Sequence, residues 1–367
     1  MLAIEMLPAG HGDALVIEYG KGSATHRVLV DGGPLHSWEG VRARLLAMPD
    51  RRYEAFVVTH VDEDHIGGAV RLLVDPDLRH RVRDVWFNGF VHCRRGGDVL
   101  GPVDGERLTR AIADGDYAWN APFPRRVGPG VGGPAVVPAA GPLPSFSLPG
   151  GGVLHLLSPT APKLKKMATV WEEVVEQAGL VGGAGTDRPA RPPKPHGKKV
   201  VPLAPGVTAA DLEALAAKSP QDGSEANGSS IAFLFEFGGQ RALLGADAHA
   251  DVLVSSLRRF GASVGEDRVR IHLCKLPHHA SRANVTTELV EAMDVSRYLV
   301  STNGDTFGHP DDAVLARLLR SSARPATIHC NYATDRTTPW RAPAAAFGVK
   351  VVMPAAGAAG LRVSATA

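Results

Sequence analysis

Residues 59–68 constrain this chain more than any other part of its sequence. They read THVDEDHIGG, so two imidazoles and three carboxylates fall within the six positions from His60 to His65. The segment follows an apolar run at residues 55–59 that is typical of a buried strand, and helical spacing follows at residues 66–74. This many ionisable groups at a strand end would repel one another or lose solvation unless a cation gathered them.

The segment therefore predicts a metal-binding loop. His60 and Asp62 point the same way if the strand continues through them, because side chains two positions apart share a face. Asp64 and His65 can converge on the same place if the next turn begins with them. An acidic surface turn with Asp64 as a helix cap would explain a single carboxylate here, but the two histidines in register favour a metal.

Length and composition set the organisation that we expect. The 367 residues exceed the usual single domain. We expect one domain over residues 1–367 with an insertion at about residues 89–226. Residues 89–152 and 182–205 are rich in Gly and Pro and predict loops, with a strand at 153–157 and a helix at 165–178 between them.

The regular elements alternate in a way that favours a layered α/β protein. Strands are expected early in the chain at residues 2–7, 14–19, 26–30 and 55–59, with a helix at 38–48. Later, a hairpin at 231–244 precedes helices at 250–260, 286–293 and 311–321. Strands at 270–276, 297–301, 326–329 and 349–353 alternate with these helices.

Charge and cysteine content narrow the setting of the protein. A net charge of +2 does not by itself imply a polyanionic partner. The three cysteines form no C-x-x-C pair and no disulfide framework, which fits a reducing compartment. The N-terminus lacks a basic region before its apolar run, and no long uncharged apolar stretch is present. We expect a cytoplasmic protein without membrane contact.

Seven sequence blocks together resemble one known superfamily. Residues 59–65 look like the H-x-[HD]-x-D-H signature of metallo-β-lactamases, in the form with Asp at the second ligand position. Residues 10–14 (GHGDA) and 29–33 (LVDGG) resemble the opening strands of the branch that includes the C-terminal domain of the DNA-uptake protein ComEC. Phosphorylcholine esterase is a related enzyme. The other blocks are residues 227–230 (NGSS), 243–247 (LLGAD), 276–281 (LPHHAS) and 307–310 (FGHP).

The resemblance implies a metallo-β-lactamase-like four-layer αββα sandwich with a dinuclear metal site at one edge of its sheets. His60 and Asp62 would hold one metal, Asp64 and His65 the second, and Asp247 would bridge both. The resemblance places His279 on the second metal. Further roles follow for residues near the metals: His278 as a contact to substrate or leaving group, His309 as a phosphate contact or proton donor, and Asp31 as a group orienting a ligand. Asp64, His278 and His309 are the candidate catalytic residues.

Departures from the family pattern bear on which metal is bound. Asn227 lies where many members place another histidine ligand, so it is at most a weak ligand. With Asp62 also replacing histidine, the site is rich in hard oxygen donors. Two divalent ions are expected, Zn²⁺ or Mn²⁺, with Mg²⁺ as a further candidate. Ala246 and Ala280 stand where the branch has glycine, and His11 where it has glutamine.

The resemblance favours a hydrolase that cleaves phosphodiester bonds, with nucleic acid as a candidate substrate. Basic residues at 163–166 and 188–199 could follow a phosphate backbone, although a solvated linker explains the second stretch equally well. Hydrolysis of a small ester or lactone is one alternative. Another is a non-catalytic subunit of a bacterial defence or processing system, with the insertion as its contact surface.

Overall fold

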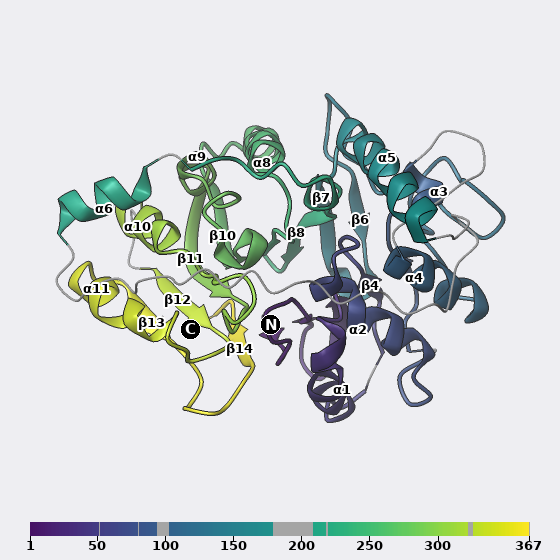
Figure 1. The fold of residues 1–367 in the computed structure, drawn as a ribbon, viewed down its shortest axis with the longest axis horizontal. Helices are drawn as coiled ribbons and strands as arrows, with labels where there is room; N and C mark the ends of the chain where they lie inside the picture. The colour runs from purple at the N-terminus through teal and green to yellow at the C-terminus, as the bar shows by residue number, and fades with distance from the viewer. Residues whose placement is uncertain are drawn as a thin grey trace.

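The computed structural model describes residues 1–50, 52–79, 81–93, 103–178, 208–217, 219–321 and 326–366. Within these residues, the strands form two sheets (Figure 1). The first sheet has six described strands. In sheet order they are β14 (Leu361–Ser364), β1 (Leu2–Met6), β2 (Leu15–Tyr19), β3 (His26–Val30), β4 (Ala55–Val57) and β5 (Val85–Trp86). Neighbours run antiparallel from β14 to β3 and parallel from β3 to β5.

The second sheet has eight strands in the described part of the chain. In sheet order they are β13 (Lys350–Val352), β12 (Thr327–Cys330), β11 (Met293–Val300), β10 (Val269–Lys275), β9 (Gln240–Leu244), β8 (Ala232–Phe237), β7 (Val153–Ser158) and β6 (Ser145–Ser147). Neighbours from β13 to β9 are parallel, and those from β9 to β6 are antiparallel.

A core between the sheets shows how they stack. Side chains of β1 to β4 such as Ile4 and Ile17 share this core with Phe233, Leu244 and Leu273 of the second sheet. On β2 and β8 successive residues point alternately into this core and into an outer one, as the strand period of two requires. Strands buried on both faces explain the nearly continuous apolar runs in the sequence.

Helices cover the outer face of each sheet. The first sheet packs against α1 (Trp38–Leu46), α2 (Glu63–Val74), α4 (Val103–Asp114) and α5 (Ala161–Ala178). The second packs against α6 (Ala209–Ala216), α8 (Ala250–Val264), α9 (Thr287–Glu291), α10 (Asp312–Ser321) and α11 (Arg341–Ala346). The order helix, sheet, sheet, helix confirms the expected four-layer αββα fold class.

The expected loop at residues 89–152 is only partly a loop. It contains α3 (Phe90–Cys93) and α4, and the short helix η2 (Pro149–Gly151) follows β6. Leu108 and Ile112 on α4 are buried in the same core as Trp171 of α5, so this part of the chain belongs to the helical layer. The spacing of these apolar residues is helical, but the surrounding Gly and Pro hid it. Residues 182–205 lie outside the described residues.

Four short helices complete the described elements. They are η1 (Leu35–Ser37), α7 (Glu225–Gly228), η3 (Pro277–Ala280) and η4 (Thr338–Trp340). The two chain ends approach each other through β1 and β14, which pair antiparallel near the middle of the view in Figure 1. Among the described residues, no helix is both long and apolar enough to cross a bilayer.

Candidate metal centre

The loop between β4 and α2 carries the first candidate ligands. The chain is extended at Asp62, which is the N-cap of α2 although its side chain makes no capping hydrogen bond. The helix begins at Glu63 rather than at residue 66, so Asp64 and His65 lie in its first turn. Asp64 is therefore not the cap of this helix. Two carboxylates in the first turn also complement the positive end of the helix dipole.

Asp31 anchors this loop from the end of β3. The backbone N–H of Thr59 donates to Asp31 Oδ1 over 2.7 Å, and the Thr59 hydroxyl donates to Oδ2 over 2.8 Å. His65 Nδ1 lies 2.8 Å from Asp31 Oδ2. Asp31 thus contacts both the backbone before the motif and the ring of His65 within it.

Asp247 lies after β9 and faces the loop with both carboxylate oxygens. Its Oδ1 is 3.4 Å from His65 Nε2, and its Oδ2 is 3.9 Å from His60 Nε2. Asp62 approaches the same side, with Oδ2 3.6 Å from His60 Nε2. His60, His65 and Asp247 are all buried and offer ligand atoms within 4.8 Å of one another.

Asp64, His65 and His279 form a second group of the same kind. Asp64 Oδ2 lies 3.3 Å from His279 Nε2 and 3.9 Å from His65 Nε2. His279 belongs to η3, which follows β10 of the second sheet. The two groups share His65, and Asp247 and His279 come from the second sheet, so the site joins loops from both sheets.

The histidines present their Nε2 atoms to this centre because their Nδ1 atoms are held elsewhere. His60 Nδ1 lies 3.0 Å from the Thr59 hydroxyl, His65 Nδ1 faces Asp31, and His279 Nδ1 lies 2.8 Å from the Ser301 carbonyl oxygen. The Nε2 atoms of all three are buried and have no hydrogen-bond partner, and neither has Asp247 Oδ1. Buried polar atoms are normally paired, so these unpaired atoms fit a shared metal.

The charges of the site also favour a cation. Burial opposes a charge on Asp247, but His278, His65 and His279 outweigh it and hold the Asp247 pKa well below its usual range. Burial likewise opposes a charge on His65, but Asp247 and Asp64 hold its pKa well above the usual value. The pKa of His279 rises to about 9 against the effect of burial, mainly through Asp13 and Asp247. The carboxylates therefore favour positive charge at the positions of the rings.

His278 also lies beside the candidate ligands, with its ring facing Asp247. Its Nε2 is 3.6 Å from Asp247 Oδ2, the same oxygen that faces His60. Its Nδ1 lies 2.8 Å from Asn284 Oδ1. His278 therefore shares the orientation of the other three histidines, although its side chain is 23% exposed.

His309 lies at the edge of the site. Its ring centroid is 5.3 Å from that of His278, and its Nδ1 is 3.4 Å from Asp311 Oδ2. Burial lowers its pKa, so a neutral ring is expected at pH 7. His11 lies nearby, with its ring 5.5 Å from that of Phe307. These side chains form the rim of the candidate site.

Asn227 lies at the candidate site. The orientation of its side-chain amide is fixed by Asp222, a residue that the sequence did not identify. Asn227 Nδ2 donates to Asp222 Oδ2 over 2.7 Å, while its Oδ1 is buried and unpartnered. Asp222 and Asn284 are the polar neighbours that the motifs missed. Neither lies in a block that resembles the superfamily, and only their position in space connects them to the site.

Two departures from the expected glycines occur at backbone positions with positive φ. Ala246 has φ 46° and Ala280 has φ 65°, and His278 and His279 have φ 48° and 53°. Residues other than glycine rarely adopt this conformation, and it occurs often at functional sites. The glycine expected from the resemblance is thus explained by backbone geometry, and the alanines retain the turn at some cost in strain.

A further buried charge lies beneath the site. Lys275 at the end of β10 is fully buried, and its Nζ lies 2.6 Å from Asp13 Oδ2. Asp13 Oδ1 is 3.5 Å from His279 Nδ1. This ion pair joins two residues that are 262 positions apart in the sequence.

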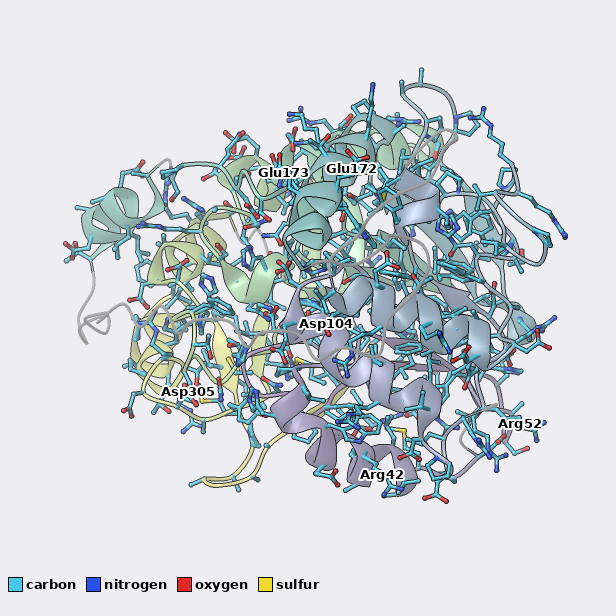
Figure 2. All side chains as sticks on the ribbon, turned by 45° about the vertical axis from the view of Figure 1, so that its right-hand side comes forward. Arg42, Arg52, Asp104, Glu172, Glu173 and Asp305 are labelled. Carbon is cyan, nitrogen blue, oxygen red and sulfur yellow. The ribbon has the colours of Figure 1, made fainter. Side chains whose placement is uncertain are left out.

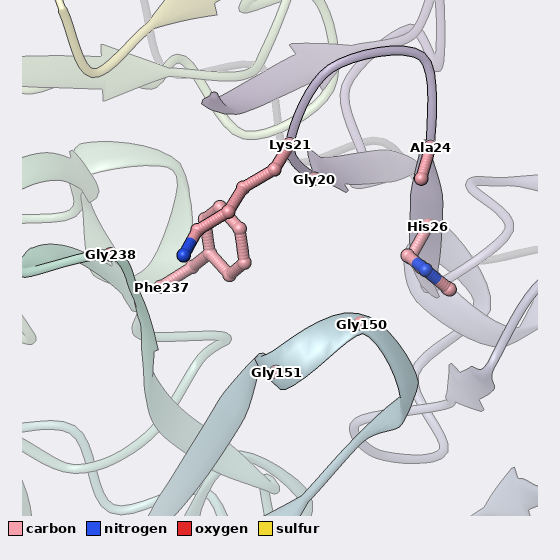
Figure 3. A pocket seen from close by; sticks show the side chains of 8 residues that line it. All are labelled: Gly20, Lys21, Ala24, His26, Gly150, Gly151, Phe237 and Gly238. Carbon is pink, nitrogen blue, oxygen red and sulfur yellow. The ribbon is translucent and has the colours of Figure 1, made fainter.

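A pocket between loops of the two sheets lies away from these residues. Its volume is about 220 Å³, and Lys21, His26 and Phe237 are among the residues that line it (Figure 3). His26 begins β3 whereas Asp31 follows the end of that strand, and Phe237 precedes β9 whereas Asp247 follows it. The pocket therefore lies at the opposite ends of the strands from the candidate metal centre.

The basic residues at 163–166 lie at the start of α5. Lys163 Nζ is 2.7 Å from His249 Nδ1 and 3.6 Å from Asp251, while Lys165 and Lys166 are exposed. The same helix carries Glu172 and Glu173, so its surface is not uniformly basic (Figure 2). Residues 188–199, the other basic stretch, lie outside the described residues.

Comparison with known proteins adds solved structures but no sequence relatives. No family model matches the chain, and no curated protein matches its sequence. The chain is similar to the metallo-β-lactamase fold protein YhfI from Bacillus subtilis, at 10% identity over 99% of both chains with a TM-score of 0.38. It is also similar to the metallo-β-lactamase SMB-1, bound to 2-mercaptoethanesulfonate. Identity there is 13%, over 86% of this chain and 92% of the other, with a TM-score of 0.28. Both of these solved structures are metallo-β-lactamase fold proteins. The candidate metal centre described above is identified from the contacts within this chain alone.

Proposed function

We propose that this protein is a metal-dependent hydrolase that cleaves phosphodiester bonds. The observation that carries the proposal is the position of Asp247, whose two oxygens face His65 on one side and His60 on the other. A carboxylate between two groups of buried, unpaired imidazole nitrogens is suited to bridge two divalent ions. His60 and Asp62 would hold one ion, and Asp64, His65 and His279 the other.

Bound divalent ions would lower the pKa of a shared water toward neutrality and neutralise charge that builds up on the oxygens of the substrate. The protein's own contribution is to hold the ligands in place through Asp31, Thr59 and the Ser301 carbonyl. His309 and His11 at the rim would contact the substrate. Because the pKa of His309 is lowered, it acts there as a neutral hydrogen-bonding ring.

The choice of phosphodiesters rests on donor chemistry and on the resemblance of the sequence blocks to the ComEC-like branch. Three carboxylates, Asp62, Asp64 and Asp247, make the donor set harder than one built mainly of histidine or cysteine. Hard donors favour Mn²⁺ or Mg²⁺ alongside Zn²⁺, and such ions suit the charged oxygens of a phosphodiester.

The test uses the full chain, stripped with EDTA and reloaded separately with Mn²⁺, Zn²⁺ or Mg²⁺. We expect Mn²⁺-dependent cleavage of bis(p-nitrophenyl) phosphate and of single-stranded DNA. Asp64→Ala and Asp247→Ala should reduce cleavage to background. Asp77→Ala should retain it, because Asp77 is a half-exposed partner of Arg42 outside the site.

A parallel panel separates the competing functions. Cleavage of p-nitrophenyl acetate or a lactone, with none of either phosphodiester, would replace the proposal by an ester or lactone hydrolase. Failure to bind any divalent metal after reloading, measured by elemental analysis, would rule out a metal-dependent hydrolase and favour a non-catalytic subunit.

A further inference from the structure

Asp222 connects the region before α7 to the candidate metal centre. Its side chain is only 10% exposed, and its Oδ1 accepts the backbone N–H of Ser224 over 2.9 Å. Its Oδ2 accepts from Asn227 Nδ2 over 2.7 Å and from Asn284 Nδ2 over 2.9 Å. One carboxylate thus holds two amide side chains, one on α7 and one in the loop between η3 and α9.

This contact fixes the orientation of both amides. An ionised carboxylate can only accept hydrogen bonds, so each asparagine must turn its NH₂ group toward Asp222 and its oxygen away. The Asn284 NH₂ is held further by the carbonyl oxygens of Asp247 and Ala248, at 3.1 and 3.3 Å. A reversed Asn284 amide would place its oxygen against three acceptors, so the reversed state is disfavoured.

The orientation of Asn284 in turn sets the tautomer of His278. Asn284 Oδ1 lies 2.8 Å from His278 Nδ1, so this nitrogen must carry the proton and donate it. The lone pair of the neutral ring is then on Nε2, which lies 3.6 Å from Asp247 Oδ2. Nε2 and Asp247 Oδ2 at this distance need a positive charge between them, which is either a second proton on the ring or a metal ion that replaces that proton.

We propose that Asp222, acting through Asn284, holds His278 as a metal ligand on the Asp247 Oδ2 side of the site. His278 would share this ion with His60 and Asp62, and would supply the imidazole that the chain lacks at Asn227. Asp222 is then a positioning residue. The inference rests on the proposed metal centre but changes the role of His278 from substrate contact to ligand.

Metal binding tests this directly and does not depend on activity. EDTA-treated protein is titrated with Co²⁺ and Mn²⁺ by calorimetry, and the visible absorption of bound Co²⁺ is recorded. Wild-type protein should bind two ions, and His278→Ala should retain one tight site. Asp222→Asn should retain both sites with one weakened by about 10–100-fold, the usual effect of losing a group that orients a ligand.

Two further variants guard against misfolding and indirect effects. His278→Gly suits the backbone at this position, where φ is 48°, and added imidazole should restore the second Co²⁺ ion to it. Asp114→Asn is the matched control, since Asp114 is an exposed partner of Arg110 on α4. This control should bind both ions as the wild type does.

The results distinguish this inference from the proposed function. If His278→Ala binds two ions with wild-type affinity, His278 is not a ligand. If Asp222→Asn leaves both affinities and the Co²⁺ spectrum unchanged, Asp222 does not position His278. If the wild type binds two ions and His278→Ala binds one, but no phosphodiester is cleaved, the inference stands and the substrate proposal fails.

Discussion

Asp31 lies behind the candidate ligands and holds the loop that carries them. Both of its oxygens accept hydrogen bonds from Thr59, and one of them also lies 2.8 Å from His65 Nδ1. It is almost completely buried. Replacing one oxygen by an NH₂ group would set a donor against a donor and leave one of these groups unpaired.

Asp31→Asn should therefore bind metal more weakly while retaining the candidate ligands. We expect a loss of about 10–100-fold in affinity for the ion held by His65, as found when a residue behind a metal ligand is changed. Calorimetric titration of the EDTA-treated variant measures this loss, with Asp114→Asn as the control. Unchanged affinity would show that His65 does not need Asp31 for its orientation.

The pKa values of His278 and His279 also predict how metal affinity changes with pH. Despite burial, the carboxylates raise the pKa of His278 and His279 to about 9, from a usual value of 6.5. Both rings are therefore protonated at pH 7 when no metal competes, and metal binding must displace these protons. Affinity for Mn²⁺ should rise between pH 7 and 9, with proton release that calorimetry in buffers of different ionisation enthalpy detects.

The raised pKa values of His278 and His279 also predict how pH changes stability. The metal-free protein should become less stable as pH rises, whereas its affinity for metal increases. A histidine whose pKa is raised by folding stabilises the folded state fully below its unfolded pKa, and this contribution is lost as pH rises through the folded value. In EDTA, the melting temperature should fall between about pH 6.5 and about pH 9. A melting temperature that rises over this interval would contradict the assigned environment of His278 and His279.

At the scale of elements, α2 is placed against β3 by contacts between glycines. A Cβ at Gly68 would lie 2.1 Å from the Gly32 carbonyl oxygen, and a Cβ at Gly32 would lie 2.2 Å from the backbone nitrogen of Ala69. Only glycine permits this approach, which brings the first turn of α2 beside Asp31. The Gly67-Gly68 pair in the motif thus serves the packing of the helix.

Gly68→Ala should destabilise the protein by about 1–3 kcal/mol, the usual cost of inserting a methyl group where there is no room. Thermal or urea unfolding measures the change. Gly40→Ala is the matched control, since Gly40 lies on the exposed face of α1 and its nearest neighbour would be 3.6 Å from the new Cβ. The control should be neutral or up to about 1 kcal/mol more stable. Equal effects of both variants would argue against the close contact.

At the scale of the whole molecule, the two sheets are joined near the chain ends. β14 pairs with β1, and Val363 and Ala365 are buried in the core between the sheets. Arg297 on β11 donates to the Ala365 carbonyl oxygen over 3.0 Å, which links the second sheet to the end of the first. β14 thus covers an edge that β1 would otherwise expose.

Removal of residues 358–367 should destabilise the fold by roughly 2–4 kcal/mol, mainly through the lost burial of Val363 and Ala365. It should also promote association, because β1 would become an exposed apolar edge strand. Differential scanning calorimetry and light scattering measure the two effects. Removal of residues 366–367 alone is the control and should change neither.

The local features of this protein follow from its sequence alone. Apolar runs predicted most of the strands, although not β5, β6 or β14. The spacing of residues 59–65 placed two histidines and three carboxylates at a strand end. These features are local, because strand and helix periods depend on neighbours in the chain. The same reasoning placed the start of α2 three residues late and overlooked α4, since Gly and Pro around a helix weaken its pattern.

The distant residues that surround the candidate ligands are known only from the fold. Asp222, Asn284 and the Ser301 carbonyl lie outside any recognisable motif, and they meet His278 and His279 because loops from both sheets converge. The buried Lys275 is likewise explained only by Asp13, which is 262 positions away. Hydrogen bonds act over about 3 Å in space regardless of separation along the chain. Candidate ligands could therefore be predicted from sequence, while the groups that orient them required the tertiary structure.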